Sequence, residues 1–152
     1  MYYDTIAPGY DELYEKEQLH KLQYISHIIK GKVLDIGAGT GIVAKKFPNV
    51  TSLDPSAGML QFAPEPKVVA KAESIPFKRD EFDTIVSLTA LHHTDIDQVI
   101  KEMQRLNPKN IGITILKKSK KCEEIIAKLQ KAFNMKILEE EKDIILIKEC
   151  KR

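Results

Sequence analysis

The stretch from Val33 to Gly41 constrains the fold of this chain more than any other part of the sequence. It reads V-L-D-I-G-A-G-T-G, an apolar run long enough for one buried strand that then breaks into glycines at alternate positions, and a helix-compatible segment, Ile42 to Phe47, follows. A strand, a glycine turn and a helix in this order form the nucleotide- and phosphate-binding arrangement of open α/β sheets. Glycine is needed at such a turn because the backbone bends sharply and a ligand approaches where a Cβ atom would clash.

The spacing of the glycines restricts the ligand. Dinucleotide-binding folds use G-x-G-x-x-G, whereas this chain has G-x-G-x-G, with Asp35 two residues before Gly37. A phosphate-binding loop needs G-x-x-x-x-G-K-[ST], and Lys45 and Lys46 fall too late for that pattern. A carboxylate beside the loop repels phosphate and favours an amino group, so a ligand that carries an amino group is predicted.

This stretch resembles the first motif of the class I S-adenosylmethionine-dependent methyltransferases, V-L-D-I-G-x-G-x-G, at every position. The resemblance implies that the loop formed by Gly37, Ala38, Gly39 and Gly41 wraps the methionine part of S-adenosylmethionine. It also implies that Asp35 faces the amino group of this cofactor, directly or through water. The alternative is a glycine-rich turn in another kind of α/β protein.

The second strand is predicted over Asn49 to Asp54. Asp54 follows Gly37 by 17 residues, close to the ~20-residue offset at which an acid meets the ribose hydroxyls in nucleotide-binding α/β folds. A carboxylate suits that role because it accepts hydrogen bonds from two vicinal hydroxyls. The segment D-P-S-A-G-M-L also resembles the family pattern D-x-S-x-x-M-L, which places Pro55 and Met59 at the cofactor. The alternative role of Asp54 is a helix cap.

The third and fourth strands are predicted over Lys67 to Ala70 and Phe82 to Leu88. Between them, A-E-S-I-P-F resembles the G-D-A-E-x-[LI]-P-F segment of the small-molecule methyltransferases of the ubiquinone/menaquinone-biosynthesis type. The resemblance places adenine beside Ala72 and Glu73. The chain departs from the pattern at Lys71, which replaces the acid that takes the adenine amino group. Because lysine accepts no hydrogen bond, the Ala72 backbone or Glu73 is expected to make that contact instead.

The loop after the fourth strand carries the candidate catalytic residues. The resemblance implies that Leu88 to His92 forms the floor between the cofactor and the methyl acceptor. The loop lacks the [ND]-P-P-[YF] pattern of methyltransferases that act on exocyclic amines and glutamine amides, so a more readily ionised nucleophile or an activated carbon is expected. His92 and His93 are candidates for a general base because imidazole titrates near neutrality. The alternative is that they line the site or cap the next helix; no third ligand is near, so no metal is expected.

Residues 1–30 are predicted to form a helical segment, with apolar residues at helical spacing between Leu13 and Ile29 after a turn at Pro8-Gly9. The steps Tyr3-Asp4 and Tyr10-Asp11 resemble the leading segment of the same methyltransferase group. That resemblance implies a lid over the cofactor, with Tyr10 in contact with it. The alternative is an amphipathic helix capped by Asp11 and packed on the sheet.

The second half of the chain completes the predicted sheet. A helix over Asp95–Leu106, a strand over Ile111–Leu116 and a helix over Ser119–Phe133 precede two strands, Met135–Glu139 and Ile144–Lys148. The charged turn between these two strands is so short that they can pair only as an antiparallel hairpin. The predicted fold is therefore α/β, a Rossmann-like, seven-stranded, mostly parallel sheet with a reversed last strand and helices on both faces.

Composition limits the class of protein. The chain has 152 residues, of which 43% are hydrophobic and 30% charged, which is typical of one soluble globular domain over residues 1–152. No apolar run approaches the ~20 residues of a membrane span, and the first residues do not resemble a signal peptide. A cytoplasmic protein without membrane contact is expected. A net charge of +2 does not by itself indicate a nucleic-acid binder.

The expected function is S-adenosylmethionine-dependent methyl transfer to an unidentified small-molecule acceptor. The lysine-rich run Lys117–Lys121 follows the fifth strand, at the sheet edge where ligands of open α/β proteins bind. An anionic substrate or an RNA backbone is therefore a hypothesis beside the simpler one of a solvated lysine run. Two further interpretations stay open, an RNA or protein methyltransferase that relies on a small partner subunit, and a non-catalytic S-adenosylmethionine-binding protein, which Lys71 makes plausible.

Overall fold

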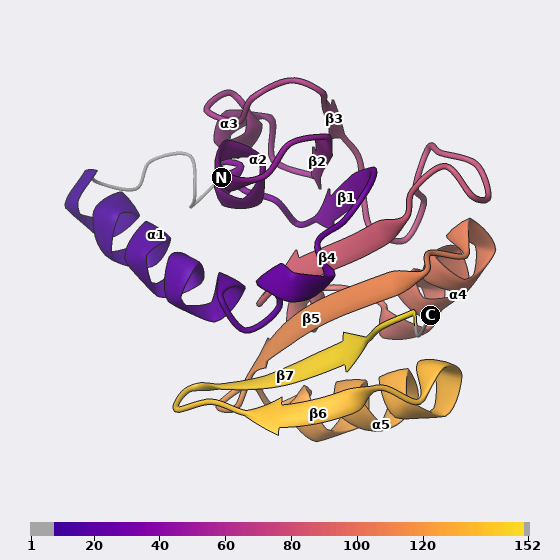
Figure 1. Ribbon diagram of the computed structural model, residues 1–152. Helices are drawn as coiled ribbons and strands as arrows, with labels where there is room; N and C mark the ends of the chain where they lie inside the picture. The colour runs from indigo at the N-terminus through magenta and orange to yellow at the C-terminus, as the bar shows by residue number, and fades with distance from the viewer. Residues whose placement is uncertain (1–7, 151–152) are drawn as a thin grey trace.

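Seven strands form one sheet in the order β3-β2-β1-β4-β5-β7-β6 (Figure 1). The computed structural model describes residues 8–150, with side chains from Glu12 onward. The strands are β1 (Val33–Ile36), β2 (Val50–Asp54), β3 (Lys67–Val69), β4 (Thr84–Leu88), β5 (Asn110–Leu116), β6 (Lys136–Glu139) and β7 (Asp143–Lys148).

The strand directions confirm the predicted plan. Strands β1 to β5 run parallel, and β7 pairs antiparallel with both β5 and β6. β7 is therefore the reversed last strand, joined to β6 by the short charged turn at residues 140–142. The strand boundaries differ from the predicted ones by one or two residues because sequence patterns do not fix where pairing stops.

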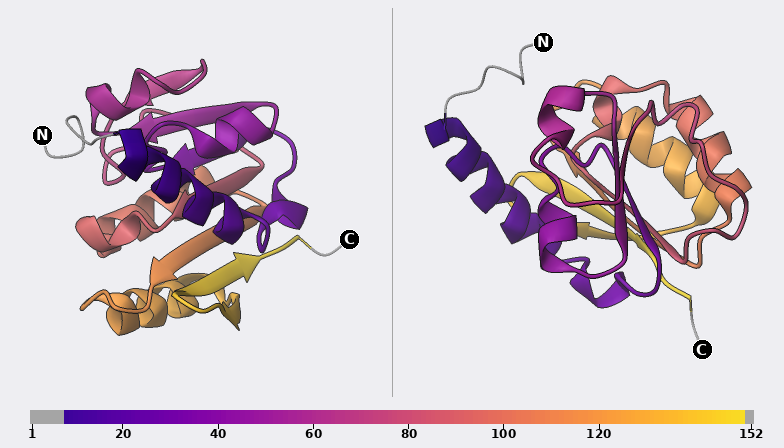
Figure 2. Two further views of the ribbon diagram at one scale, coloured as in Figure 1. Left: turned by 90° about the vertical axis from the view of Figure 1, so that its left-hand side faces the viewer. Right: turned by 90° about the horizontal axis from the view of Figure 1, so that it is seen from above.

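Side chains alternate between the two faces of the sheet, and helices cover both (Figure 2). Leu34 and Ile36 of β1 point into a core shared with α4 (Ile96–Leu106) and α5 (Cys122–Phe133). Val33 points into a second core on the opposite face. That face is covered by α1 (Pro8–Leu22), the 3-10 turn η2 (Ser26–Ile28) and α2 (Ile42–Lys46).

The N-terminal helix differs from the prediction in its bounds and its packing. α1 begins at Pro8, where a turn was predicted, since proline is tolerated in the first turn of a helix. It ends at Leu22 instead of continuing to Ile29, and the chain then turns so that Ile25 and Ile28 pack on β5. The absence of a side chain at Gly112 permits this approach, because a Cβ atom there would lie 3.1 Å from Ile25.

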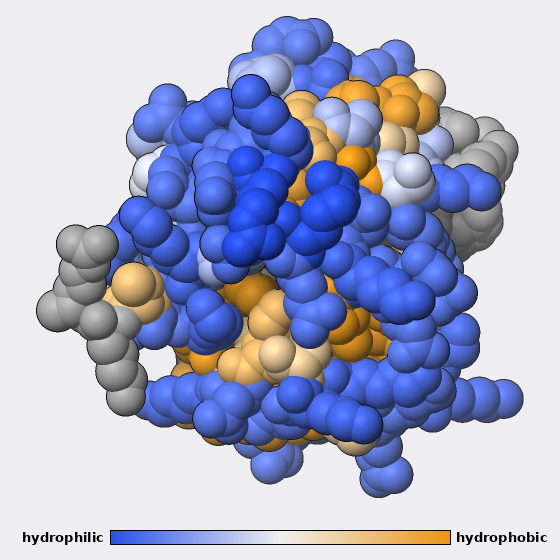
Figure 3. Space-filling view, turned by 90° about the vertical axis from the view of Figure 1, so that its right-hand side faces the viewer, coloured by the Kyte–Doolittle hydropathy of each residue, from blue (hydrophilic) through white to orange (hydrophobic). Residues whose placement is uncertain are grey.

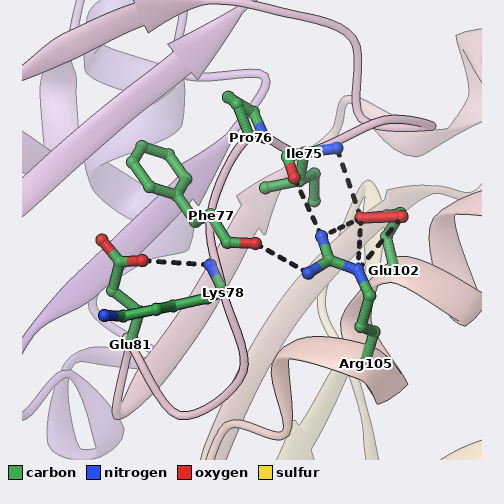
Figure 4. A pocket seen from close by; sticks show the side chains of 7 residues that line it. All are labelled: Ile75, Pro76, Phe77, Lys78, Glu81, Glu102 and Arg105. Carbon is green, nitrogen blue, oxygen red and sulfur yellow. Dashed lines mark hydrogen bonds and ion pairs between the residues drawn. The ribbon is translucent and has the colours of Figure 1, made fainter.

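An arginine on α4 holds the loop that leads into β4 (Figure 4). The guanidinium of Arg105 donates to the carbonyl oxygens of Phe77 at 2.7 Å and Ile75 at 2.8 Å. Glu102 binds the same guanidinium, and its carboxylate also accepts from the Ile75 N–H. The seven residues drawn in Figure 4 line a shallow groove whose polar groups mostly bond to one another, so its role is structural.

Arg105→Lys is expected to lower the free energy of unfolding by about 1 kcal/mol, because an ammonium group cannot serve two carbonyls with the geometry of the planar guanidinium. Chemical denaturation measures the change. Arg79→Lys is the matched control, since Arg79 makes only an exposed ion pair with Asp80 at 3.9 Å. An equal loss in both variants would contradict the structural role of Arg105.

The surface on the side where β4 and β5 begin is largely hydrophilic, with apolar groups gathered in hollows between the polar ones (Figure 3). Large exposed apolar residues within the described range include Leu13, Phe62 and Val69, exposed by 59%, 61% and 56%. Leu13 was predicted to belong to the packed face of the N-terminal helix, and it faces solvent instead. None of the helices within residues 8–150 has the length and apolar character that crossing a membrane demands.

Candidate functional site

A pocket of about 610 Å³ lies at the carboxyl ends of β1, β2 and β4. This is the edge at which open α/β sheets bind ligands. Its lining comes from α1, from the loops after these strands, from the segment after β3 and from the end of β5. The lining residues are Tyr14, Ile36, Gly37, Gly39, Leu53, Asp54, Pro55, Ser56, Met59, Lys71, Ala72, Glu73, Thr89, Ala90, Leu91, His92, His93, Thr94 and Leu116.

The glycine loop has the backbone that the sequence predicted. Gly37 and Gly41 have φ angles of +74° and +81°, in the left-handed region that side chains disfavour. A Cβ atom at Gly37 would lie 2.4 Å from the Cβ of Ala90. The N–H groups of Gly37 and Ala38 both donate to the Leu53 carbonyl, at 2.8 and 3.0 Å. These bonds fix the loop against the end of β2.

Asp54 ties the glycine loop to the start of the next helix, α3 (Ala57–Leu60). One carboxylate oxygen accepts from the Gly39 N–H at 2.9 Å, and the other accepts from the Ser56 N–H at 2.8 Å. Each oxygen keeps a further acceptor site, because an ionised carboxylate has about four lone-pair positions. The cap-like bond to Ser56 and the predicted ribose contact are therefore compatible.

Asp35 is an acid buried in the middle of the sheet. It is 2% exposed and lies in register with Ser52 of β2. Burial, and next the nearby Asp54 carboxylate, raise the pKa of Asp35 well above its ordinary value. Asp35 is not among the residues that line the pocket. It lies two residues before Gly37, which does line the pocket. A cation bound at the glycine loop would favour the ionised form of this carboxyl group.

A cationic ligand lowers the pKa of Asp35, so it is expected to bind more tightly as the pH rises from the pKa of Asp35 in the complex to its raised pKa in the free protein. Above that pH the affinity should be constant. Binding should release a proton in this window, because the ligand favours the carboxylate. The folding stability of the free protein changes in the opposite sense. The stability that the raised pKa of Asp35 contributes is fully present below the pKa of this group in the unfolded chain. It is lost as the pH rises through the pKa of the group in the folded protein.

Calorimetric titration of S-adenosylmethionine in two buffers with different ionisation enthalpies measures this proton release. Asp35→Asn is the control, because the asparagine side chain has no proton to release. In this variant the position should contribute no pH dependence to the affinity. Equal apparent enthalpies in both buffers across the window would contradict the coupling.

The predicted adenine residues belong to the same pocket as the glycine loop. Ala72 and Glu73 line it, and so does Lys71. The Oε2 atom of Glu73 accepts from the Asp95 N–H at 2.9 Å, where Asp95 is the N-cap of α4. The Glu73 carboxylate is thus held beside the pocket by the helix start, with its other oxygen available as an acceptor.

Thr89 begins the loop after β4 in an unusual conformation. Its φ angle of +54° is an outlier for a β-branched residue and carries strain of about 1–3 kcal/mol. The Thr89 N–H donates to the Thr114 carbonyl at 2.9 Å, and the side-chain oxygen accepts from Lys21 Nζ at 2.8 Å. These contacts hold the strained residue at the pocket wall.

The two candidate histidines form the turn η3 (Leu91–His93), and both line the pocket. Their ring centroids are 3.9 Å apart. Burial lowers the pKa of His92, as do His93, Lys121 and Lys21, while Asp143 acts in the opposite direction. His92 is therefore neutral at neutral pH, which is the state a proton acceptor requires.

Some predicted residues lie away from the pocket lining. Leu88 is 5% exposed, and its side chain packs in the core under α1 and α2. Gly41 and Ala38 shape the loop without lining the pocket. The Tyr10 side chain and the whole of Tyr3 lie outside the described residues.

The structure also adds lining residues that the sequence analysis had not assigned to the site. Tyr14 lies one helical turn after Tyr10 on α1, and this spacing is a signal that could have identified it. Ser56 belongs to the D-x-S-x-x-M-L segment, whose resemblance pointed only to Pro55 and Met59. Leu116 had no local signal, because only the sheet topology brings the end of β5 to this place.

The lysine run directly follows Leu116, which lines the pocket. Lys117 is paired with Glu139 at 2.7 Å. Within residues 8–150, Lys118, Lys120 and Lys121 are exposed and make no ion pair. Lys121 lowers the pKa of His92, so its positive charge acts at the part of the pocket lining that this ring forms.

Comparison with known proteins supports the interpretation of the pocket. The family model described as "Methyltransferase domain" matches residues 34–111, the part of the chain that holds most of the pocket lining. A ubiquinone/menaquinone biosynthesis C-methyltransferase of Hahella chejuensis is 29% identical over 90% of this chain and 66% of its own length. An uncharacterized protein of Methanocaldococcus jannaschii is 38% identical over 69% of this chain and 45% of its own length. The chain thus spans about half the length of the first curated relatives it matches.

Two solved structures share the fold. A SAM-dependent methyltransferase of Thermotoga maritima, described as a possible histamine N-methyltransferase, superposes with a TM-score of 0.75 at 18% identity, over 98% of both chains. A putative methyltransferase of Haloferax volcanii, solved with the Trm112 methyltransferase activator, gives a TM-score of 0.73 at 14% identity, over 95% of this chain and 94% of the other.

Proposed function

This chain belongs to the S-adenosylmethionine-dependent methyltransferase family, and we propose that it transfers a methyl group from this cofactor to a small-molecule acceptor. The observation that carries the proposal is that Gly37, Gly39, Asp54 and Ala72 all line one pocket.

The residues of the pocket fit the cofactor in charge and in shape. Gly37 and Gly39 line the pocket without side chains of their own, and the buried Asp35 carboxyl group beside them favours a cationic neighbour. Asp54 keeps acceptor capacity for ribose hydroxyls. When bound, S-adenosylmethionine supplies a methyl group that its sulfonium already activates. The protein therefore has to bind the cofactor and the acceptor, orient them, and exclude water.

We assign the glycine loop and Asp35 to the amino-acid end of the cofactor, and Asp54 to its ribose. Ala72 and Glu73 are assigned to the adenine, in keeping with the resemblance. The loop from Thr89 to His92 then separates cofactor from acceptor. The helix α1, which brings Tyr14 to the pocket, is assigned the role of a cover.

The chemistry at the acceptor side favours an anionic small molecule. The pocket has the volume of a small-ligand site, and the lysines at positions 118, 120 and 121 place positive charge beside it. Replacing all three by alanine should weaken acceptor binding and leave the cofactor affinity unchanged. Unchanged acceptor affinity would contradict the anionic assignment.

The proposed function is tested in two steps with the purified chain. Titration with S-adenosylmethionine, S-adenosylhomocysteine and NAD should show binding of the first two only. Incubation with cofactor labelled in the methyl group and with size-fractionated cell extract should then move label into the low-molecular-weight fraction. Tight NAD binding would overturn the cofactor assignment, and label confined to RNA or protein would overturn the acceptor class.

A partner-dependent RNA or protein methyltransferase is the second candidate. The observation that favours it is the likeness to the Haloferax volcanii methyltransferase solved with the Trm112 activator, together with the exposed lysines near the pocket. Co-purification with a small partner, and transfer of label to bulk tRNA only when that partner is present, would favour this candidate over the small-molecule one.

A further inference from the structure

A polar cluster that is mostly buried adjoins the pocket through Thr89, which lines it. Its members are Lys21 of α1, Thr89 after β4, Thr114 of β5 and Asp143 of β7. Asp143 is completely buried, and its Oδ2 atom is paired with Lys21 Nζ at 3.1 Å. The Thr89 hydroxyl donates to the same Oδ2 atom at 3.0 Å and lies 3.0 Å from the Thr114 hydroxyl. Lys21 and Thr89 thus both bind the buried carboxylate, and Thr114 joins the cluster through Thr89.

Two buried atoms of opposite hydrogen-bonding capacity remain without a partner here. Within the described part of the chain, Asp143 Oδ1 and His92 Nδ1 are buried polar atoms that make no hydrogen bond. Leaving a buried polar group unpaired is costly, so each such atom calls for an explanation. The first is an acceptor only, and the second is a donor whenever His92 carries its proton on Nδ1. The other ring nitrogen, Nε2, is not among these buried atoms, and His92 lines the pocket.

Within the described residues, four titratable groups act on the His92 ring through their charge. His93 lies on the same turn, Lys121 at the start of α5, Lys21 on α1 and Asp143 at the start of β7. Asp143 is the one anion among these groups, so it is the group that stabilises a proton on the ring. The pairing of Lys21 with Oδ2 fixes Asp143 and leaves Oδ1 for His92.

We propose that Asp143, held by Lys21 and Thr89, positions His92 as the general base for an acceptor whose reacting atom carries a proton. Asp143 Oδ1 accepts from His92 Nδ1–H, across one water or after a small movement of the Leu91–His93 turn. The Nε2 lone pair then faces the pocket. In methyl transfer the carbon–acceptor bond forms as the carbon–sulfur bond of the sulfonium breaks, and the electron pair of the broken bond stays on the sulfur of S-adenosylhomocysteine. The acceptor proton passes to Nε2, and Asp143 stabilises the resulting imidazolium. This inference rests on the proposed function and adds to it a class of acceptor and a positioning residue.

The test is a nitrogen-15 NMR titration of the His92 ring in the free protein, which needs no knowledge of the acceptor. The wild-type ring is expected to carry its proton on Nδ1 at pH 8. Asp143→Asn should lower the pKa of His92 by about 1 and shift the proton towards Nε2. Lys21→Met should raise the pKa, because it removes a cation. Asp97→Asn is the matched control on the exposed surface and should change neither quantity.

A wild-type ring with its proton on Nε2 would overturn the proposal, even if neither cluster variant folds. So would an Asp143→Asn protein that is folded and keeps both the wild-type pKa and the wild-type tautomer. Titration with S-adenosylmethionine is run in parallel. If the protein does not bind S-adenosylmethionine, the proposed function fails. If it binds the cofactor but the wild-type His92 ring carries its proton on Nε2, only the role of Asp143 fails.

Discussion

Replacing Gly37 by alanine is expected to lower the free energy of unfolding by about 3 kcal/mol and to weaken S-adenosylmethionine binding at least tenfold. Two costs add in this variant. The left-handed backbone conformation costs roughly 1–2 kcal/mol for an L-residue with a side chain, and the new Cβ atom would lie 2.4 Å from the Cβ of Ala90. Overpacking of this kind costs about 1–3 kcal/mol. Chemical denaturation and calorimetric titration measure the two effects.

Two further variants separate strain from overlap. Gly39→Ala shares the left-handed backbone, with φ at +58°, but its Cβ atom meets only the flexible end of Met59 at 3.4 Å. It should therefore lose only about 1 kcal/mol of stability. Adding Ala90→Gly to Gly37→Ala removes the Cβ atom with which the new side chain overlaps. The double variant should therefore recover the part of the lost stability that this overlap causes. If the double variant is no more stable than Gly37→Ala alone, the contact with Ala90 is not the cause.

Replacing Asp54 by asparagine is expected to reduce the affinity for S-adenosylhomocysteine about 100-fold, since charge-assisted hydrogen bonds to the ribose are each worth about 1.5–3 kcal/mol. In the wild-type protein the N–H groups of Gly39 and Ser56 both donate to the Asp54 carboxylate. In the variant, the amide NH₂ group therefore faces one of these two N–H donors. A moderate loss of stability should accompany the loss of affinity.

An analogue of S-adenosylhomocysteine without the two ribose hydroxyls distinguishes the direct contact from loosening of the loop. The wild-type protein should bind this analogue much more weakly than the parent compound. The Asp54→Asn protein should discriminate little between the two ligands, because the partner of the hydroxyls is already gone. Fully additive losses would show that Asp54 acts only through the loop.

Local sequence signals predicted the part of the fold that depends on neighbouring residues. The apolar run at Val33–Ile36 and the glycines after it specify a strand and a left-handed turn within a few residues, and both are present. The pairing of β6 and β7 followed from the short turn between them, and with it the reversed strand of the sheet. Periodic apolar residues likewise identified α4, and the structure has Asp95 as its N-cap.

The features that sequence reasoning missed depend on contacts between distant parts of the chain. α1 looked like a helix packed through apolar residues, whereas Gln18 donates to the Leu88 carbonyl and Lys21 pairs with Asp143. Nothing near Lys21 in the sequence indicates a buried partner in β7. The strained conformation of Thr89 was equally hidden, because it is held by groups from α1, β5 and β7 and not by its neighbours.

The most direct test of the central assignment is a crystal structure of the chain with S-adenosylhomocysteine. The account predicts the amino-acid end of the ligand at the Gly37–Gly41 loop near Asp35, the ribose hydroxyls on Asp54 and the adenine beside Ala72. A ligand that binds elsewhere, or a pocket at the glycine loop that closes with side chains and excludes it, would contradict the account.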